Sequence, residues 1–120
     1  MPARQAVDAA NVVYTRGSDH HMIAAQLPVD AELVYESFLR IIRERPDISI
    51  VTQKDAAMML EVTRDDLTLT GQVSALGAGR SLLYVWGDAG HSGLSGRELT
   101  ERAVAYICED LGVSIERVDY

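Results

Sequence analysis

The stretch LTLTGQVSALGAGRSLLYVW, residues 67–86, decides the fold class. Between Leu67 and Ala75, apolar or small residues take every second position and polar residues take the positions between them. This period of two is typical of a strand with one buried and one solvent-facing side. Residues 77–80 are turn residues, and a second alternating run follows them. The stretch therefore predicts an antiparallel hairpin.

The second strand of this hairpin carries apolar residues on both sides. We expect Leu82, Tyr84 and Trp86 to face the core, because large aromatic side chains usually serve burial. The alternative places Leu83 and Val85 inside. A sheet with apolar residues on both faces often associates with a copy of itself, so we predict a homo-oligomer that uses the outer face or an edge of the sheet.

An amphipathic helix precedes the hairpin, and its start is well marked. Asp30 stands at the N-cap position, where its carboxylate can accept the free N–H groups of the first turn. Val29 and Val34 occupy the two positions of a hydrophobic staple. Pro46 ends the helix, because it disfavours helical geometry at the residue before it. The apolar face is expected to consist of Val34, Phe38, Ile41 and Ile42.

Short segments with strand character account for most of the remaining chain. Residues 12–14 and 22–27 can pair as a hairpin, and residues 1–10 are expected to form a flexible arm. A polar turn at residues 64–66 leads into the central hairpin. Because the connections are short, the strands are expected to form an antiparallel meander. Two further strands are expected around the alternating sets Ile48, Ile50, Thr52 and Met58, Leu60, Val62.

A second helix follows a glycine-rich loop. Ser95 and Glu98 form a capping box at its start, with Leu94 and Leu99 as its staple. Gly112 fits the left-handed position after the last turn, and residues 113–118 can add a final short strand. The buried stripe is expected to consist of Leu99, Ala103, Ile107 and Leu111.

Together these elements predict one α+β domain over residues 1–120: an antiparallel sheet of about five to six strands with two helices packed on one face. The length of 120 residues, with 48% hydrophobic and 24% charged residues, suits one such domain. We expect the two helices to leave no room for a reactive cleft. A chain of this size has space for at most a shallow cavity.

Charge and cysteine content exclude several classes of function. Eleven basic against eighteen acidic residues give a net charge of −7, the wrong sign for general nucleic-acid binding. No apolar run approaches the roughly 20 residues that span a bilayer, so no membrane insertion is expected. The single cysteine, Cys108, excludes an internal disulfide and any multi-cysteine metal site. The compartment stays open between the cytoplasm and, if a targeting segment has been removed, the periplasm or envelope.

The histidines are the first candidates for a metal or catalytic site. His20 and His21 follow Asp19, and His91 comes shortly after Asp88. Adjacent residues on a strand point to opposite faces, so His20 and His21 could hold one ion only from an irregular turn. Their spacing matches no established zinc pattern, and exposed loop histidines are the preferred interpretation.

Other candidate chemistry is weaker. Residues 87–93, GDAGHSG, have the glycine content of a phosphate loop but lack its lysine and the dinucleotide spacing, so anion binding at residues 93–98 is only a hypothesis. Cys108 is expected to be a small core or boundary residue. The acid pairs Asp65–Asp66 and Glu109–Asp110 fall at a turn and a helix end, where solvated acids are normal. We therefore assign no catalytic, cofactor-binding or metal-ligating residue and expect no cofactor.

Two family resemblances can be stated. The segments LPVDAELVY (27–35) and LGAGRSLLYV (76–85), followed by a glycine-rich loop and a capped helix, resemble small uncharacterised bacterial envelope proteins, many of them lipoproteins. That resemblance implies the strand, helix, meander, helix order and carries no functional residues. The pattern Pro-Val-Asp-x-x-x-Val-Tyr at 28–35 is also similar to the start of helix-grip lipid- and polyketide-binding domains, which implies a carrier of small apolar ligands.

The sequence therefore leads to two main hypotheses about function. The first is a non-enzymatic binding or structural domain that self-associates, with the bacterial envelope as a candidate location. The second is a small apolar-ligand carrier of helix-grip type. An apolar cavity between the sheet and the helices would favour the carrier, and a solid core would favour the first hypothesis. A metal protein using His20, His21 or His91 is a third hypothesis.

Overall fold

The computed structural model describes residues 9–15, 21–88 and 96–119, and it contains two helices and seven strands. A 3₁₀ helix, Asp55–Ala57, separates the third and fourth strands. In chain order the elements are β1 (Ala9–Thr15), β2 (His21–Leu27), α1 (Ala31–Arg43), β3 (Ser49–Lys54), β4 (Met59–Arg64), β5 (Leu67–Gly77), β6 (Arg80–Asp88), α2 (Gly96–Leu111) and β7 (Ser114–Asp119).

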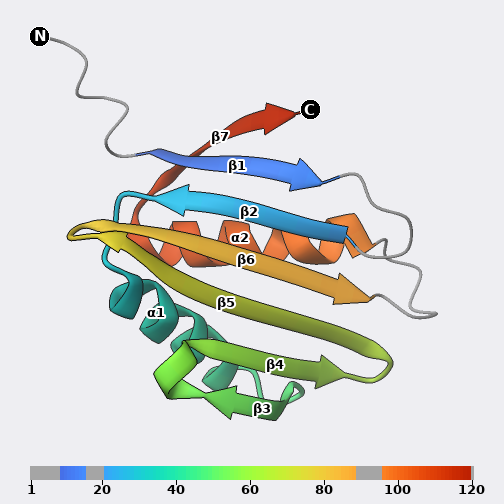
Figure 1. Ribbon diagram of the computed structural model, residues 1–120. Helices are drawn as coiled ribbons and strands as arrows, with labels where there is room; N and C mark the ends of the chain where they lie inside the picture. The colour runs from blue at the N-terminus through green and yellow to red at the C-terminus, as the bar shows by residue number, and fades with distance from the viewer. Residues whose placement is uncertain (1–8, 16–20, 89–95, 120) are drawn as a thin grey trace, which may run out of the picture.

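All seven strands belong to one sheet, in the order β3-β4-β5-β6-β2-β1-β7 (Figure 1). The meander from β3 to β6 is antiparallel, as expected from its short connections. The pairing of β1 with β2 confirms the first hairpin. The final short strand that the sequence allowed at residues 113–118 is present as β7. It pairs parallel to β1 at the edge of the sheet. β1 begins at Ala9, inside the segment that was expected to be a flexible arm.

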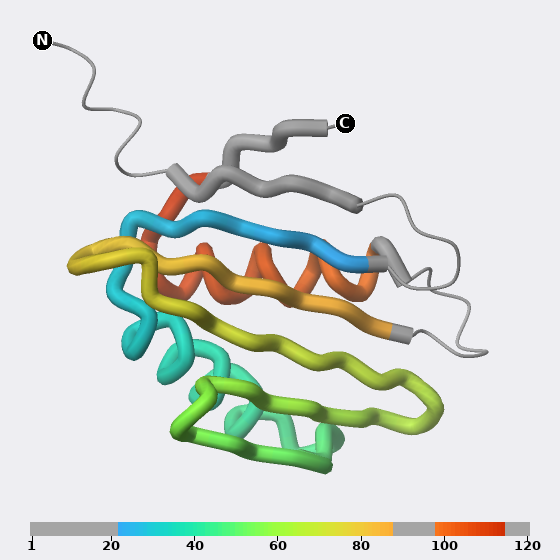
Figure 2. The backbone as a smooth tube through the Cα atoms, in the orientation of Figure 1, coloured from blue at the N-terminus to red at the C-terminus, as the bar shows by residue number. Residues whose placement is uncertain are grey.

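Both helices lie on the same face of the sheet, and the opposite face carries no helix among the described residues (Figures 1 and 2). α2 packs against β2 and β6, while α1 packs against β5, β6 and α2. The predicted α+β fold class is therefore confirmed. The core lies between the two layers, and its largest fully buried side chains include Phe38, Ile23, Leu60, Leu83 and Ile107.

The expected orientation of β6 is wrong. Leu83 and Val85 are fully buried beneath the helices, while Leu82, Tyr84 and Trp86 are half-buried on the helix-free face. The reason is the short distance between the helices and the middle of the sheet. Several inner positions around Leu83 and Val85 are occupied by small residues, namely Ala25, Gly71, Ser81 and Gly87, and the others by aliphatic residues such as Ile23 and Val73. A Tyr or Trp side chain would not fit in this layer.

The start of α1 is only partly as predicted. Asp30 is the N-cap residue, but its side chain makes no capping hydrogen bond. Its Oδ1 instead accepts a hydrogen bond from the backbone N–H of Gly79, in the turn between β5 and β6. Of the four residues of the predicted apolar face, Val34, Phe38 and Ile42 are buried and Ile41 is partly buried.

The buried stripe of α2 is displaced from the predicted one. Thr100, Val104, Ile107 and Cys108 are almost fully buried. The predicted residues Leu99, Ala103 and Leu111 are only partly buried, because they flank this stripe. Gly112 has a φ of +71°, as expected for a helix C-terminus. Ser95 and Leu94, which belong to the predicted cap, lie outside the described residues.

Strand β3 differs from its expected alternation. A bulge between Ile50 and Thr52 shifts its register against β4. Ile50 and Val51 are both exposed, so β3 contributes little to the core. The strand forms one edge of the sheet, where a bulge hinders pairing with another chain.

Candidate functional site

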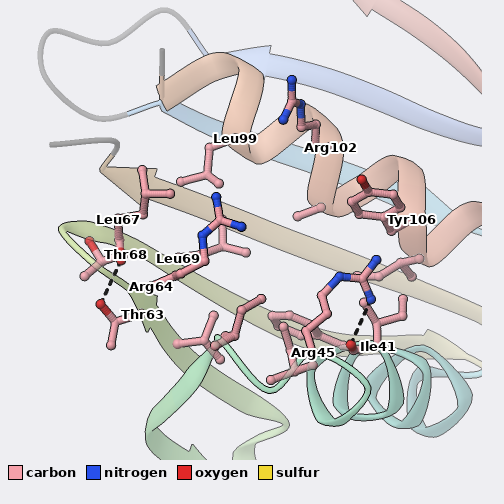
Figure 3. Close-up of a pocket in the computed structure, with 16 residues that line it drawn as sticks. Ile41, Arg45, Thr63, Arg64, Leu67, Thr68, Leu69, Leu99, Arg102 and Tyr106 are labelled. Atoms are coloured by element: carbon pink, nitrogen blue, oxygen red, sulfur yellow. Dashed lines mark hydrogen bonds between the residues drawn. The ribbon is translucent and has the colours of Figure 1, made fainter. Parts of the chain in front are cut away.

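An apolar cleft opens between the two helices at the β4–β5 end of the sheet (Figure 3). We call it the interhelix cleft; its volume is about 170 Å³. The sequence analysis allowed at most a shallow cavity, and the structure contains a small apolar one at this place. The lining residues of the interhelix cleft come from the second half of α1, the segment after it, the β4–β5 hairpin and α2.

The walls of the interhelix cleft are mainly aliphatic and aromatic. α1 contributes Phe38 and Ile42, the sheet contributes Val62 and Leu69, and α2 contributes Ala103 among others. The small side chain of Ala103 leaves space in the wall where most helix residues would project. Tyr106 lies at the opening and is 45% exposed.

Gly71 positions one wall of the interhelix cleft. The ring of Phe38 lies so close to the β5 backbone that a Cβ on Gly71 would be 2.3 Å from Phe38 Cε2. A glycine inside a strand often marks such a close approach. The absence of a side chain at Gly71 therefore lets the Cε2 edge of the Phe38 ring reach the sheet.

Three arginines line the interhelix cleft: Arg45, Arg64 and Arg102. Arg45 donates from Nη1 to the carbonyl of Ile41 at 3.0 Å. Its guanidinium also lies over the Tyr106 ring, 4.8 Å from the ring centroid, a distance typical of a cation–π contact. These two contacts hold Arg45 in place between α1 and α2.

The other two arginines are more exposed. Arg64 extends from the end of β4 and pairs with Asp47 at 3.3 Å, with 46% of its side chain accessible (Figure 3). Arg102 projects from α2 and makes no ion pair or hydrogen bond with another described residue. No acidic side chain is present among the described residues that line the interhelix cleft. The charged residues that line the interhelix cleft are therefore all basic, in a chain whose net charge is −7, and one of the three, Arg64, is paired with Asp47. We call these three arginines the arginine rim.

The histidine candidates cannot be placed against this site. His20 and His91 lie outside the described residues, and for His21 only the backbone is described, at the start of β2. The glycine-rich segment 87–93 is also described only in part: Gly87 and Asp88 end β6, and residues 89–93 lie outside the described residues. Among the described residues, no group of three His, Cys, Asp or Glu side chains is arranged to hold a metal ion.

Cys108 is a core residue, as predicted. It is 1% exposed on the inner side of α2. Burial raises the pKa of its thiol to about 11. A protonated buried thiol is a poor nucleophile, so Cys108 is not suited to covalent chemistry.

Two carboxylates have structural partners that the sequence did not predict. Asp110 accepts a hydrogen bond from Ser37 Oγ at 2.7 Å and pairs with Arg40, and these contacts lower its pKa. They connect the end of α2 to α1. Asp55 accepts a hydrogen bond from the Tyr35 hydroxyl at 2.7 Å. The pKa of Asp55 is lowered by the hydrogen bonds from Tyr35 and from Gln53.

No pattern in the sequence indicated the arginine rim. Arg64 was expected only in a polar turn and Arg45 only as the residue before Pro46, and no role was expected for Arg102. The three residues lie far apart in the chain and follow no common spacing, so no sequence signal connects them. The one local sign in the sequence was Gly71, since a glycine inside a strand often marks a place where another part of the chain approaches the strand backbone closely.

Comparisons with known proteins add information on the fold. No family model matches the chain, and no curated protein matches it. A conserved protein of unknown function, EF2215 from Enterococcus faecalis, superposes with a TM-score of 0.53 at 8% identity, covering 85% of this chain and 77% of that one. The Zhui aromatase/cyclase from Streptomyces sp. R1128 has a TM-score of 0.45 at 12% identity, covering 75% of this chain and 84% of that one. The similarity to EF2215 shows a shared fold.

Neither helix in the described part of the chain combines the length and the apolar character of a membrane-spanning segment.

Proposed function

We propose that this protein binds a small apolar molecule in the interhelix cleft. The carrying observation is the cleft itself: an apolar space of about 170 Å³ that opens between the sheet and both helices. Cavities of ~150 Å³ lined by aliphatic and aromatic side chains hold one benzene ring. A ligand whose apolar part is about one ring or a short alkyl chain therefore suits the space. This is the hypothesis of a small apolar-ligand carrier that the sequence suggested. That the protein binds such a ligand without catalysing a reaction is a prediction.

The fold is compatible with this proposal. The meander and its two covering helices enclose the interhelix cleft from three sides, and the open side leaves a path for a ligand. Ligand pockets are typically concave and lined mainly by apolar and aromatic side chains, as this cleft is. The resemblance of residues 28–35 to helix-grip carriers also favours it.

Titration of the ¹⁵N-labelled protein with ethylbenzene, followed by amide chemical shifts, tests the proposal. We expect saturable shifts concentrated at Leu69 and Ala103. The variant Ala103→Phe places a ring in the interhelix cleft and should abolish the shifts. Ala105→Phe, two residues along α2 at an exposed position, makes the same chemical change outside the cleft and should leave them intact. Absence of saturable shifts in the unmodified protein, or equal binding by both variants, would refute ligand binding at this site.

A second proposal concerns self-association, and a different observation supports it. Leu82, Tyr84 and Trp86 form a half-buried strip on the helix-free face, and Met22 pairs with Trp86 across β2 and β6. We propose that a second copy of this chain covers this strip, since apolar surface on an open sheet is a common dimer contact. Sedimentation equilibrium should give more than one chain per particle, and Trp86→Lys should reduce it to one. A monomeric mass for the unmodified protein would contradict the proposal.

A further inference from the structure

We propose that the ligand of the interhelix cleft carries an anionic group, a carboxylate or one of similar charge, and that Arg64 and Arg102 bind this group at the opening. The inference rests on the proposed function and defines the chemical class of the ligand: an amphiphile with a small apolar body and one negatively charged end.

The charged residues that line the interhelix cleft are opposite in sign to the net charge of the chain. The chain carries eighteen acidic and eleven basic residues, so a random selection of its charged residues would contain more acids. The described residues lining the interhelix cleft include three arginines and no acid. An apolar ligand alone does not require any charge at the opening. An anionic group there would be attracted by these positively charged side chains, more strongly where the apolar cleft wall keeps water away.

The arginines of the interhelix cleft differ in how many of their N–H donors the protein already uses. A guanidinium has five N–H donors in a planar arrangement that suits carboxylate oxygens. Arg45 uses one donor on the Ile41 carbonyl and lies over Tyr106, so its position is constrained by the protein. It therefore contributes a fixed positive charge. Arg102 has no partner among the described residues, and Arg64 has Asp47 alone, in an exposed pair.

Arg64 can leave its present partner, Asp47, with little loss of stability. The Arg64–Asp47 pair is exposed on both sides, with 46% and 59% of the side chains accessible. Exposed ion pairs contribute little to stability, so Arg64 can exchange Asp47 for a ligand carboxylate at small cost. Figure 3 shows the Arg64 side chain extending from the sheet toward α2, across the apolar residues of the cleft. A ligand with its apolar end among these residues would thus meet Arg64 with its charged end.

Binding of 3-phenylpropanoate compared with 3-phenylpropanamide tests the inference, because the two molecules share one apolar body and differ in charge. We expect the carboxylate to bind about tenfold more tightly at low ionic strength, as charge-assisted hydrogen bonds exceed neutral ones. The difference should shrink in 0.5 M NaCl, since salt screens exposed charges. Titration calorimetry or amide shifts measure both affinities.

Substitutions of single charged residues test whether Arg64 and Arg102 cause the preference for the carboxylate. Arg64→Gln and Arg102→Gln should each weaken carboxylate binding severalfold and leave amide binding unchanged. Arg80→Gln removes the same charge from the exposed β5–β6 turn, at the opposite end of β5 from the β4–β5 turn, and should change neither affinity. Asp47→Asn releases Arg64 and should strengthen carboxylate binding, whereas Asp65→Asn removes an equal charge from the nearby turn and should have a smaller effect.

The outcomes separate the two proposals. If ethylbenzene and the amide bind but the carboxylate has no advantage, the anionic ligand class is wrong and the proposed function stands. If the carboxylate is preferred equally by the unmodified protein and by both arginine variants, the assignment to Arg64 and Arg102 is wrong. If none of the three probes binds, the proposed function fails and the inference fails with it.

Discussion

The ring of Phe38 on α1 rests against the backbone of Gly71 on β5, at a distance that excludes a Cβ atom at position 71. This contact links the helix layer to the sheet at the floor of the interhelix cleft, and Phe38 is only 2% exposed. We expect Gly71→Ala to lower the free energy of unfolding by about 1–3 kcal/mol, because a methyl group is forced into a packed contact. Urea denaturation measures the change.

The control for this variant is a double-mutant cycle. In the Phe38→Leu background, the smaller side chain leaves room for the methyl group, so Gly71→Ala should cost clearly less. In the Phe38-containing protein, displacement of the ring into the interhelix cleft should also weaken ethylbenzene binding. An equal loss of stability in both backgrounds would show that the Phe38 contact is not the cause.

The hydrogen bond between Asp30 and Gly79 predicts a local effect in the β5–β6 turn. Asp30→Ala removes the acceptor of the Gly79 N–H, so the exchange of this amide should accelerate by roughly fivefold or more. Asp30→Asn keeps a side-chain oxygen and should retain most of the protection. The helix content should be unaffected in both variants, since the Asp30 side chain does not cap α1. Unchanged exchange at Gly79 in Asp30→Ala would contradict the contact.

The Tyr35–Asp55 hydrogen bond predicts a change in acid titration. The pKa of Asp55 lies below its usual value in the folded protein, first because Tyr35 donates to it. The contribution of the ionised Asp55 carboxylate to folding stability is therefore present above about pH 4 and is lost as the pH falls through the lowered pKa. Tyr35→Phe should raise the Asp55 pKa toward normal and flatten this part of the stability profile. Carboxyl ¹³C shifts follow the titration.

Asp110 provides an internal reference in the same spectra. Its pKa is lowered by Arg40 and Ser37, which do not contact Asp55, so Tyr35→Phe should leave the Asp110 titration unchanged. Parallel shifts of both carboxyl groups would indicate a general structural change instead of a lost hydrogen bond. The pKa of Tyr35 is raised to about 12, first by burial and then by the hydrogen bond to Asp55. The contribution of the protonated Tyr35 hydroxyl to folding stability is therefore present below pH 10 and is lost as the pH rises from 10 to 12.

The burial of Cys108 predicts slow thiol chemistry. With a pKa of about 11, the thiol remains protonated at pH 8, and the side chain is shielded by the core. Its reaction with a disulfide reagent in the native protein should be at least about a hundredfold slower than in denaturant, because only the thiolate attacks. Absorbance of the released thiolate measures the rate. Comparable rates in the two conditions would mean that the core opens readily or that the thiol is accessible.

Local patterns in the sequence determined the elements of this protein. The alternation in residues 67–75, the glycines at 77 and 79, and the Asp30 to Pro46 limits of α1 each predicted an element that the structure contains. These features depend on interactions within a few residues, so one segment suffices to read them. The α+β class followed because elements with one apolar face must pack together.

The tertiary structure alone decided which side of β6 is buried, which backbone N–H donates to Asp30, and which side chains surround the interhelix cleft. Both sides of β6 are apolar, so its own residues do not distinguish inside from outside; the narrow space under the helices does. Arg45, Arg64 and Arg102 line one cleft only because the segment after α1, the end of β4 and α2 lie around the same space. Such convergence depends on packing between distant segments, which no local pattern encodes.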